Sequence, residues 1–137
     1  MKIKNSARSP RILHADDEPM ICLSVGRALR QLGYTVMSVN DGEKAWEALN
    51  TECFDLLITD NEMPNLRGEE LVLKIREHEL DLPIIVASSQ LEFFLTPDNE
   101  GLQIAKVLKK PFFLHELVAA VQFALQDWGM LNCSQSQ

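Results

Sequence analysis

Five short apolar runs alternate with amphipathic segments along this chain, and no other feature constrains its fold as strongly. Repeated strand–helix units favour a mostly parallel sheet, because parallel strands need a long crossover connection that is usually a helix. Several runs are apolar at consecutive positions, which is typical of strands covered by helices on both faces. The predicted strands span residues 12–15, 34–39, 54–59, 83–87 and 104–108. The pattern therefore predicts an α/β domain with a five-stranded sheet.

The segments between the runs carry start and stop signals for helices. Pro19 suits the first turn of a helix that Gly33 ends, and the Asp41-Gly42 turn precedes a second helix over residues 43–49. A short helix is predicted within residues 90–101, where Pro97 interrupts the pattern. Two further helices are predicted, one bearing Leu71, Ile75 and His78 and one bearing Leu114, Leu117, Val118, Val121 and Leu125.

Length and composition exclude several classes of protein. At 137 residues the chain is one domain, and its apolar runs are far shorter than the roughly 20 residues of a membrane span. The net charge of −7 opposes direct nucleic-acid binding, which relies on basic residues. Because no charged segment followed by an apolar one opens the chain, we expect a cytoplasmic protein. The cysteines lack metal-ligand spacing and are interpreted as reduced thiols, with Cys22 and Cys53 packed and Cys133 in a polar tail.

Polar and charged residues mark the ends of four predicted strands. These residues are Asp16-Asp17, Asp60, Ser88 and Lys110-Pro111. The carboxyl ends of parallel strands meet at one edge of the sheet, where open α/β proteins bind their ligands, so we expect these side chains to converge. Three carboxylates, one hydroxyl and one ammonium group would then form a site suited to a divalent metal beside a phosphorylatable aspartate.

The acidic residues of this set fit a magnesium site. Mg²⁺ prefers oxygen ligands and usually takes one or two carboxylates together with waters and phosphate oxygens. We predict Asp17, Asp60 and the backbone carbonyl of Glu62 as ligands, with Asp16 giving water-mediated support. Without the cation, carboxylates this close would repel one another and raise at least one pKa. The alternative for Asp16-Asp17 alone is a solvated turn.

Asp60 is the candidate nucleophile, since a carboxylate attacks phosphorus to form an acyl phosphate. Phosphoryl transfer needs positioning and charge stabilisation more than bond-making groups on the protein. Lys110 would supply a point charge and Ser88 a hydroxyl donor to the phosphoryl oxygens. A cis peptide bond before Pro111 would direct the lysine. Taken singly, Lys110 would be a solvated strand-end lysine and Ser88 a turn residue.

Four segments carry a resemblance to a known family. ILHADDEP at 12–19, LLITDNEMPNLRGEEL at 56–71, PIIVASS at 83–89 and KKPF at 109–112 resemble, in order and spacing, the receiver domain of two-component response regulators. The resemblance implies a single-domain regulator of the chemotaxis type. It also implies a doubly wound, flavodoxin-like sheet with strand order 2-1-3-4-5 and five helices. We assign residues 1–9 to a flexible arm, 10–128 to the receiver domain and 129–137 to the tail.

The resemblance implies a function as well. A histidine kinase or phosphotransferase would pass a phosphoryl group from a phosphohistidine to Asp60. Asp16 and Asp17 match the metal-binding acids of the family, Ser88 its switch hydroxyl and Lys110 its phosphate-binding lysine. The surface of the fourth helix, fifth strand and last helix would then change shape and contact a downstream protein or a second copy of the chain.

The sequence departs from the family pattern in three places. Val107 replaces a frequent aromatic residue, Gln103-Ile104 replaces a Gly-Ala pair, and Ser89 replaces an alanine. These departures concern the transmission of the signal and leave the predicted chemistry complete. The family uses positions such as Glu62 and Gln90 to tune the lifetime of the phosphoryl group.

Several residues have a structural interpretation beside a functional one. We expect His14 to be a hydrogen-bonded core histidine, because strand alternation points it away from the metal site, and Trp46 and Trp128 to be packing residues. His78 and His115 have no relay partner by spacing. Phe93 and Phe94 are adjacent on one short helix, so either both pack or one is exposed as a partner contact.

We interpret the chain as a stand-alone response regulator that catalyses only its own Mg²⁺-dependent phosphorylation and dephosphorylation. It would act through protein contacts or onward phosphorelay. One alternative is a receiver-like interaction module that no longer uses phosphorylation, which Val107 favours. Another is a phosphohydrolase with an aspartyl nucleophile, with Glu62 placed where such enzymes carry a general acid. A piece of a larger hybrid kinase is the third, which the start and polar end of the chain disfavour.

Overall fold

The computed structural model describes residues 9–90, 92–95 and 102–128. The five strands form one parallel sheet in the order β2-β1-β3-β4-β5, which confirms the predicted topology. Residues 1–8 of the predicted arm and the whole predicted tail, Cys133 included, lie outside the described residues. The strands are β1 (Arg11–Ala15), β2 (Thr35–Val39), β3 (Leu56–Asp60), β4 (Ile84–Ser88) and β5 (Lys106–Lys109).

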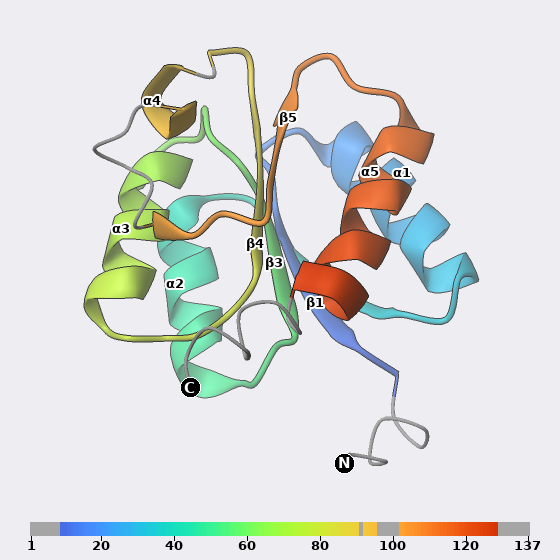
Figure 1. Cartoon of the computed structure of the whole chain (residues 1–137), viewed down its shortest axis with the longest axis horizontal. Coiled ribbons are helices and arrows are strands. Elements are labelled where there is room, and N and C mark those ends of the chain that lie inside the picture. Colours follow the sequence, from blue (N-terminus) through green and yellow to red (C-terminus); the bar gives the residue numbers. More distant parts are fainter. Residues whose placement is uncertain (1–8, 91, 96–101, 129–137) are drawn as a thin grey trace.

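Helices cover both faces of the sheet (Figure 1). Helices α1 and α5 lie on one face, and α2, α3 and α4 lie on the other. A π-helical segment, η3 (Phe123–Trp128), continues α5. The helices are α1 (Pro19–Gln31), α2 (Gly42–Thr51), α3 (Gly68–Glu77), α4 (Glu92–Leu95) and α5 (Leu114–Gln122).

The core consists of two hydrophobic clusters, one on each face of the sheet. Alternate residues of β1 belong to different clusters, with Ile12 on the side of α1 and α5 and Leu13 on the side of α2 and α3. The central strands β3 and β4 are buried along their whole lengths. This burial on both faces explains why their sequences are apolar at consecutive positions.

The helix boundaries follow the local sequence signals. Pro19 occupies the first turn of α1, and Gly33 beyond its end has a φ of 98°, a conformation that side chains other than glycine rarely adopt. Asp41 caps α2 by accepting a hydrogen bond from the backbone N–H of Lys44 at 2.8 Å. The predicted signals at these three helix ends are therefore confirmed.

The structure corrects several details of the prediction. Asp60 and Ser88 are the last residues of β3 and β4 rather than residues beyond them, because the parallel ladder continues through both. Cys53 is exposed, since it lies in the connection between α2 and β3, whereas it was predicted to pack. Phe94 is buried and Phe93 is half-buried, so neither is exposed.

Other predictions hold within the described part of the chain. Trp46 packs against the cluster beneath α2 and α3, with its ring 4.8 Å from that of His78. The side chain of Trp128 lies outside the described residues. No helix among the described residues combines the length and the apolar character needed to span a bilayer.

Candidate metal centre

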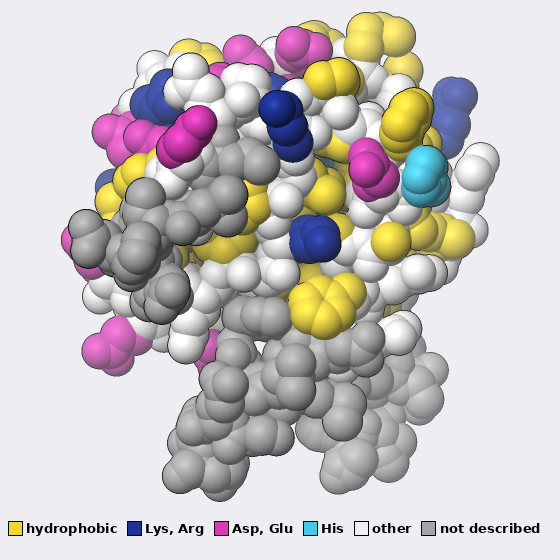
Figure 2. Space-filling model, turned by 45° about the horizontal axis from the view of Figure 1, so that its top comes forward, with side chains coloured by type: hydrophobic (Ala, Val, Ile, Leu, Met, Phe, Trp, Pro, Cys, Tyr) yellow, Lys and Arg dark blue, Asp and Glu magenta, His cyan; other side chains and the backbone are white. Residues whose placement is uncertain are grey.

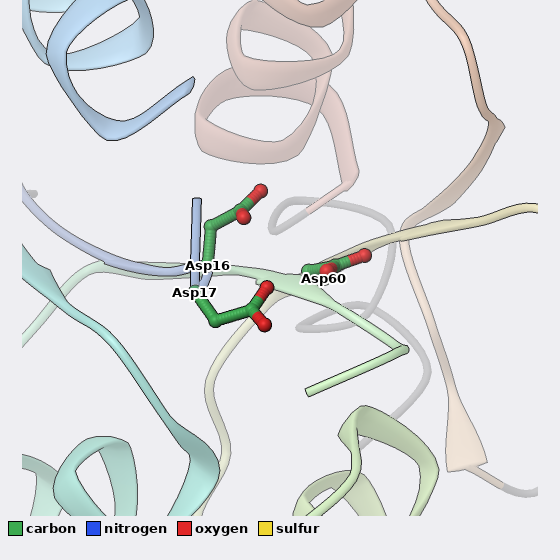
Figure 3. A group of neighbouring side chains, drawn as sticks. All are labelled: Asp16, Asp17 and Asp60. Carbon is green, nitrogen blue, oxygen red and sulfur yellow. The ribbon is translucent and has the colours of Figure 1, made fainter. Parts of the chain in front are cut away.

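Three carboxylates meet at the carboxyl edge of the sheet (Figure 3). Asp16 and Asp17 follow β1, and Asp60 ends the neighbouring strand β3. One oxygen from each carboxylate lies within 4.8 Å of the others. Asp16 and Asp60 are buried, whereas Asp17 is exposed and gives the cluster its access to solvent. The structure thus brings together the three acidic side chains predicted for the metal site.

The buried acids of this cluster are electrostatically unfavourable without a cation. Burial raises the pKa of Asp16 to about 6, and the negative charges of Asp60 and Asp17 add to the increase. Burial also raises the pKa of Asp60, although a hydrogen bond from Lys110 opposes the change. A hard divalent cation would offset this repulsion, and a set of carboxylate oxygens suits Mg²⁺. The donor set therefore fits the predicted metal.

The backbone after β1 fixes the position of Asp16. Its Oδ1 accepts a hydrogen bond from the backbone N–H of Glu18 at 2.9 Å, and its carbonyl accepts one from the Cys22 thiol at 3.3 Å. One carboxylate oxygen of Asp16 is therefore already engaged at the start of α1. That Asp16 supports the metal through water while Asp17 and Asp60 bind it directly stays a prediction.

Lys110 lies beside Asp60 at the same edge. Its Nζ donates to Asp60 Oδ1 at 2.6 Å, and its backbone N–H donates to the Ser88 carbonyl at 2.9 Å. The Lys110-Pro111 peptide bond is cis, as the sequence suggested. Burial alone would lower the pKa of Lys110, but its interactions with Asp60 and Glu62 outweigh burial and raise it. Lys110 is therefore a firmly charged group next to the candidate nucleophile.

Ser88 and Glu62 complete the site. The Ser88 side chain is fully buried, and its Oγ lies 2.8 Å from Glu62 Oε2 and 2.8 Å from the Gln90 carbonyl oxygen. Glu62 Oε1 also pairs with Lys110 Nζ at 3.2 Å. The sequence predicted that the Glu62 backbone carbonyl binds the metal and that the position of Glu62 tunes the lifetime of the phosphoryl group. It did not predict that the Glu62 side chain contacts both Ser88 and Lys110.

Residues that the sequence analysis did not single out hold the connection between β3 and α3. The Asn61 side chain accepts a hydrogen bond from the backbone N–H of Glu69 at 2.7 Å. Asn65, at a φ of 70°, donates to Asp41 Oδ2 at 2.8 Å and so joins this connection to the start of α2. At Gly68 an added Cβ would lie 2.6 Å from the Asp60 carbonyl oxygen, which explains the glycine. The sequence signal that could have located this turn is Asn65 itself, because asparagine adopts positive φ more readily than most other residues.

His14 is buried in β1, as predicted, but it is not hydrogen-bonded through Nδ1. Within the described part of the chain, this nitrogen has no hydrogen-bond partner. Burial lowers the pKa of His14 to about 4, so the ring is neutral near neutral pH. The expectation of a hydrogen-bonded core histidine is wrong for Nδ1, and the carboxylate cluster of the described residues does not include His14.

Comparison with known proteins agrees with this geometry. The family model of the response regulator receiver domain matches residues 12–122. The response regulator receiver protein CpdR of Brucella abortus is 38% identical over 112 residues, covering 82% of this chain and 93% of CpdR. The transcriptional regulatory protein PrrA of Mycobacterium tuberculosis is 33% identical over 131 residues. That match covers 94% of this chain, which spans about half (55%) of PrrA.

Solved structures share the fold. The receiver domain of the Francisella response regulator 1452 superimposes with a TM-score of 0.79 at 26% identity, covering 86% of this chain and 98% of that domain. The response regulator TrrA of Thermotoga maritima, in complex with Mg²⁺-BeF, gives a TM-score of 0.74 at 29% identity. That match covers 85% of this chain and 99% of TrrA.

Proposed function

This chain belongs to the response regulator receiver family, and from that premise we propose that it accepts a phosphoryl group on Asp60 from a phosphohistidine. The donor is a sensor histidine kinase or a histidine phosphotransferase. The protein then signals in the cytoplasm through protein contacts or passes the phosphoryl group on. Residues 10–128 act as the receiver. The chain catalyses only its own phosphorylation and dephosphorylation.

One observation carries this proposal: the 2.6 Å contact between Lys110 Nζ and Asp60 Oδ1 beside two further carboxylates. Structural ion pairs do not require such an excess of carboxylates. Here burial raises the pKa of both Asp16 and Asp60, and the neighbouring negative charges add to the increase. Perturbed acids that converge on one edge of an α/β sheet are typical of functional sites. This combination supports a site for a cation and a transferred anion.

The residues have separate tasks in the transfer. An oxygen of Asp60 attacks phosphorus, the phosphorus–nitrogen bond of the phosphohistidine breaks, and its electron pair stays on the departing imidazole. Lys110 neutralises charge on the phosphoryl oxygens, and the Ser88 hydroxyl donates a hydrogen bond to one of them. Both groups are anchored by the backbone hydrogen bond between Lys110 and Ser88.

Asp17, Asp60 and the Glu62 backbone carbonyl would hold Mg²⁺, with water-mediated support from Asp16. The cation would offset the negative charge of the acids and of the incoming phosphoryl group. The TrrA structure contains Mg²⁺-BeF bound to a protein with the same fold, which supports the assignment by analogy.

A groove beside β5 is the proposed output surface. It has a volume of about 600 Å³ and lies between β5 and α5. In the face of the molecule shown in Figure 2, hydrophobic side chains are exposed between positively and negatively charged ones. Such a mixed surface suits a transient partner or a second copy of the chain. The groove is lined by Ala105, Lys106, Leu108, His115, Glu116, Ala119, Ala120 and Phe123.

A second candidate function is a receiver-like module that signals without phosphorylation. Val107 favours it, because this half-buried residue packs against the core cluster at the position where the family often has a mobile aromatic side chain. A valine side chain is smaller than an aromatic ring, so its rotation would change the exposed apolar surface area very little. The two candidates share the partner surface but differ in whether Asp60 is modified.

Chemical trapping of the acyl phosphate separates the candidates. The protein is incubated with acetyl phosphate and Mg²⁺ and then reduced with borohydride, which converts an aspartyl phosphate to homoserine. We expect peptide mapping to find the reduced residue at position 60, with no conversion in Asp60→Asn. Conversion elsewhere would contradict the proposal. Absence of conversion would favour the phosphorylation-independent module. A separate assay with phosphate esters tests the phosphohydrolase alternative, which predicts steady turnover.

A further inference from the structure

The carboxylate of Glu62 binds the donors that a phosphoryl group on Asp60 would need. The Ser88 hydroxyl lies 2.8 Å from Glu62 Oε2, and Lys110 Nζ lies 3.2 Å from Glu62 Oε1. The backbone N–H of Ser89 also points to Glu62 Oε1 at a longer distance of 3.4 Å. One carboxylate thus interacts with three donors: a hydroxyl, an ammonium group and a backbone N–H.

These contacts place Glu62 directly beside the candidate nucleophile. Lys110 Nζ bridges Asp60 Oδ1 at 2.6 Å and Glu62 Oε1 at 3.2 Å, so the two carboxylates flank one ammonium group. A phosphoryl group joined to Asp60 would have to approach the same ammonium. Its oxygens and the Glu62 oxygens would then compete for one set of donors.

The hydroxyl of Ser88 makes the competition exclusive. It has one proton, which is shared between Glu62 Oε2 and the Gln90 carbonyl, both at 2.8 Å. A charged acceptor binds a hydroxyl proton more strongly than a neutral carbonyl does, so Glu62 holds the advantage. A phosphoryl oxygen therefore gains this proton only when Glu62 gives it up.

The Glu62 side chain is negatively charged and can move away from Ser88 and Lys110. Burial would raise its pKa, but hydrogen bonds from Ser88, Lys110 and Asn61 outweigh burial and lower it. Near neutral pH the side chain is therefore an anion. About a third (33%) of it is exposed, which leaves a path for it to swing into solvent.

We propose that Glu62 is a built-in competitor that occupies the phosphoryl-binding donors Ser88 and Lys110 until a phosphoryl group on Asp60 displaces it. This inference rests on the proposed function and adds a determinant of how readily the site is filled. The apparent affinity for a phosphoryl-like ligand falls in proportion to the fraction of molecules in which the donors are free. If Glu62 holds the donors in about nine molecules of ten, its removal raises that affinity about tenfold.

The test measures binding of beryllofluoride, a tetrahedral mimic of an acyl phosphate, in the presence of Mg²⁺. Fluorine NMR or calorimetry gives the dissociation constant for wild type and for Glu62→Ala. We expect Glu62→Ala to bind about tenfold more tightly. The matched control is Glu77→Ala, which removes the same charge at the exposed far end of α3 and should bind like wild type. Equal affinity in wild type and Glu62→Ala would overturn the inference.

A second variant separates occupancy of the donors from general repulsion. Glu62→Asp keeps the charge but draws the carboxylate back by one methylene, away from Ser88 and Lys110. If Glu62 competes by contact, Glu62→Asp should recover most of the tenfold gain. If it merely repels anions through space, Glu62→Asp should bind like wild type, and the inference would be wrong.

A third comparison distinguishes failure of this inference from failure of the proposed function. Asp60→Asn should not bind beryllofluoride whatever residue stands at position 62. If wild type and every Glu62 variant fail to bind, the proposed phosphoryl site is itself wrong. If wild type and the Glu62 variants all bind with equal affinity, the phosphoryl site is supported and only the proposed role of Glu62 is wrong.

Discussion

The two edges of the sheet each carry an ion pair, but the pairs differ in their burial and in the charges that surround them. At the amino edge Arg11 pairs with Glu52 at 2.5 Å, and both side chains are about a third exposed, at 32% and 39%. Arg11 also donates to the Cys53 carbonyl at 2.9 Å and lies over the ring of Phe54. Arg11 and Glu52 neutralise each other, and solvent screens the pair.

At the carboxyl edge one ammonium group faces an excess of carboxylates. Lys110 pairs with Asp60 at 2.6 Å, and the Asp60 side chain is only 3% exposed. Asp16, Asp17 and Glu62 crowd the same space. An ion pair alone therefore does not mark a functional site. The mark is buried charge that its surroundings leave uncompensated.

The largest expected difference between the edges comes from removing their cations. Lys110→Met would leave Asp60 buried without its partner, and breaking such a pair costs about 3 kcal/mol of the free energy of unfolding. Urea denaturation near neutral pH without Mg²⁺ measures the loss. A loss below about 1 kcal/mol would show that the carboxyl-edge pair behaves like a surface pair.

The pH dependence of stability offers the next largest effect. The folded-state pKa of Asp16 is about 6 and its ordinary value is 3.8, so the folded protein binds more protons than the unfolded chain between these values. Stability without Mg²⁺ should therefore fall as pH rises through this window, by roughly 2 kcal/mol from this group. The measurement is the difference in unfolding free energy between wild type and Asp16→Asn at several pH values.

The difference between the two proteins is needed because His14 acts in the opposite direction. Its folded-state pKa is about 4 against an ordinary value of 6.5, so its contribution to stability is lost as pH falls through that interval. This contribution is common to wild type and Asp16→Asn and cancels in the subtraction. A wild-type advantage that does not decrease with rising pH would contradict the account of Asp16.

Magnesium should stabilise the carboxyl edge by a smaller amount. At ten times its dissociation constant, a ligand that binds only the folded state adds about 1.4 kcal/mol. Thermal or urea unfolding with Mg²⁺ and with EDTA should show this gain in wild type, and Asp17→Asn should lose most of it at the same Mg²⁺ concentration. An equal gain in Asp17→Asn would mean that Mg²⁺ binds elsewhere.

The smallest effect is expected at the amino edge. Arg11→Met removes a screened pair but keeps an apolar side chain beside Phe54, so we expect a loss of less than about 1 kcal/mol of unfolding free energy. Phosphorylation of Asp60 should be unchanged. Urea denaturation measures the unfolding free energy of Arg11→Met. A loss of unfolding free energy as large as that of Lys110→Met would contradict the contrast between the two edges.

The sequence could predict the fold and the outline of the site because both depend on local patterns. Apolar runs located the strands, and the polar residues that end them, Asp16, Asp60 and Ser88, had to meet at one edge of a parallel sheet. Small boundary errors at Asp60 and Ser88 did not matter, since both positions lie at the same edge whether they end a strand or follow it.

The contacts of the loops could not be predicted in the same way. Glu62 reaches Ser88 and Lys110 because the connection after β3 is held by Asn61 and by the bond from Asn65 to Asp41. The contact of Glu62 with Ser88 and that of Asn65 with Asp41 join segments far apart in the chain. The exposure of Cys53 likewise depends on how the connection from α2 to β3 folds, which no periodic pattern reports.

Intact-protein mass after incubation with acetyl phosphate tests the central claim most directly. Wild type and Asp55→Asn, a substitution at the amino edge, should each gain one phosphoryl group with Mg²⁺ and none with EDTA. Asp60→Asn should gain none under either condition. A gain in Asp60→Asn equal to that of wild type, or no gain in wild type with Mg²⁺, would contradict the claim that the carboxyl edge is a phosphoryl-accepting site.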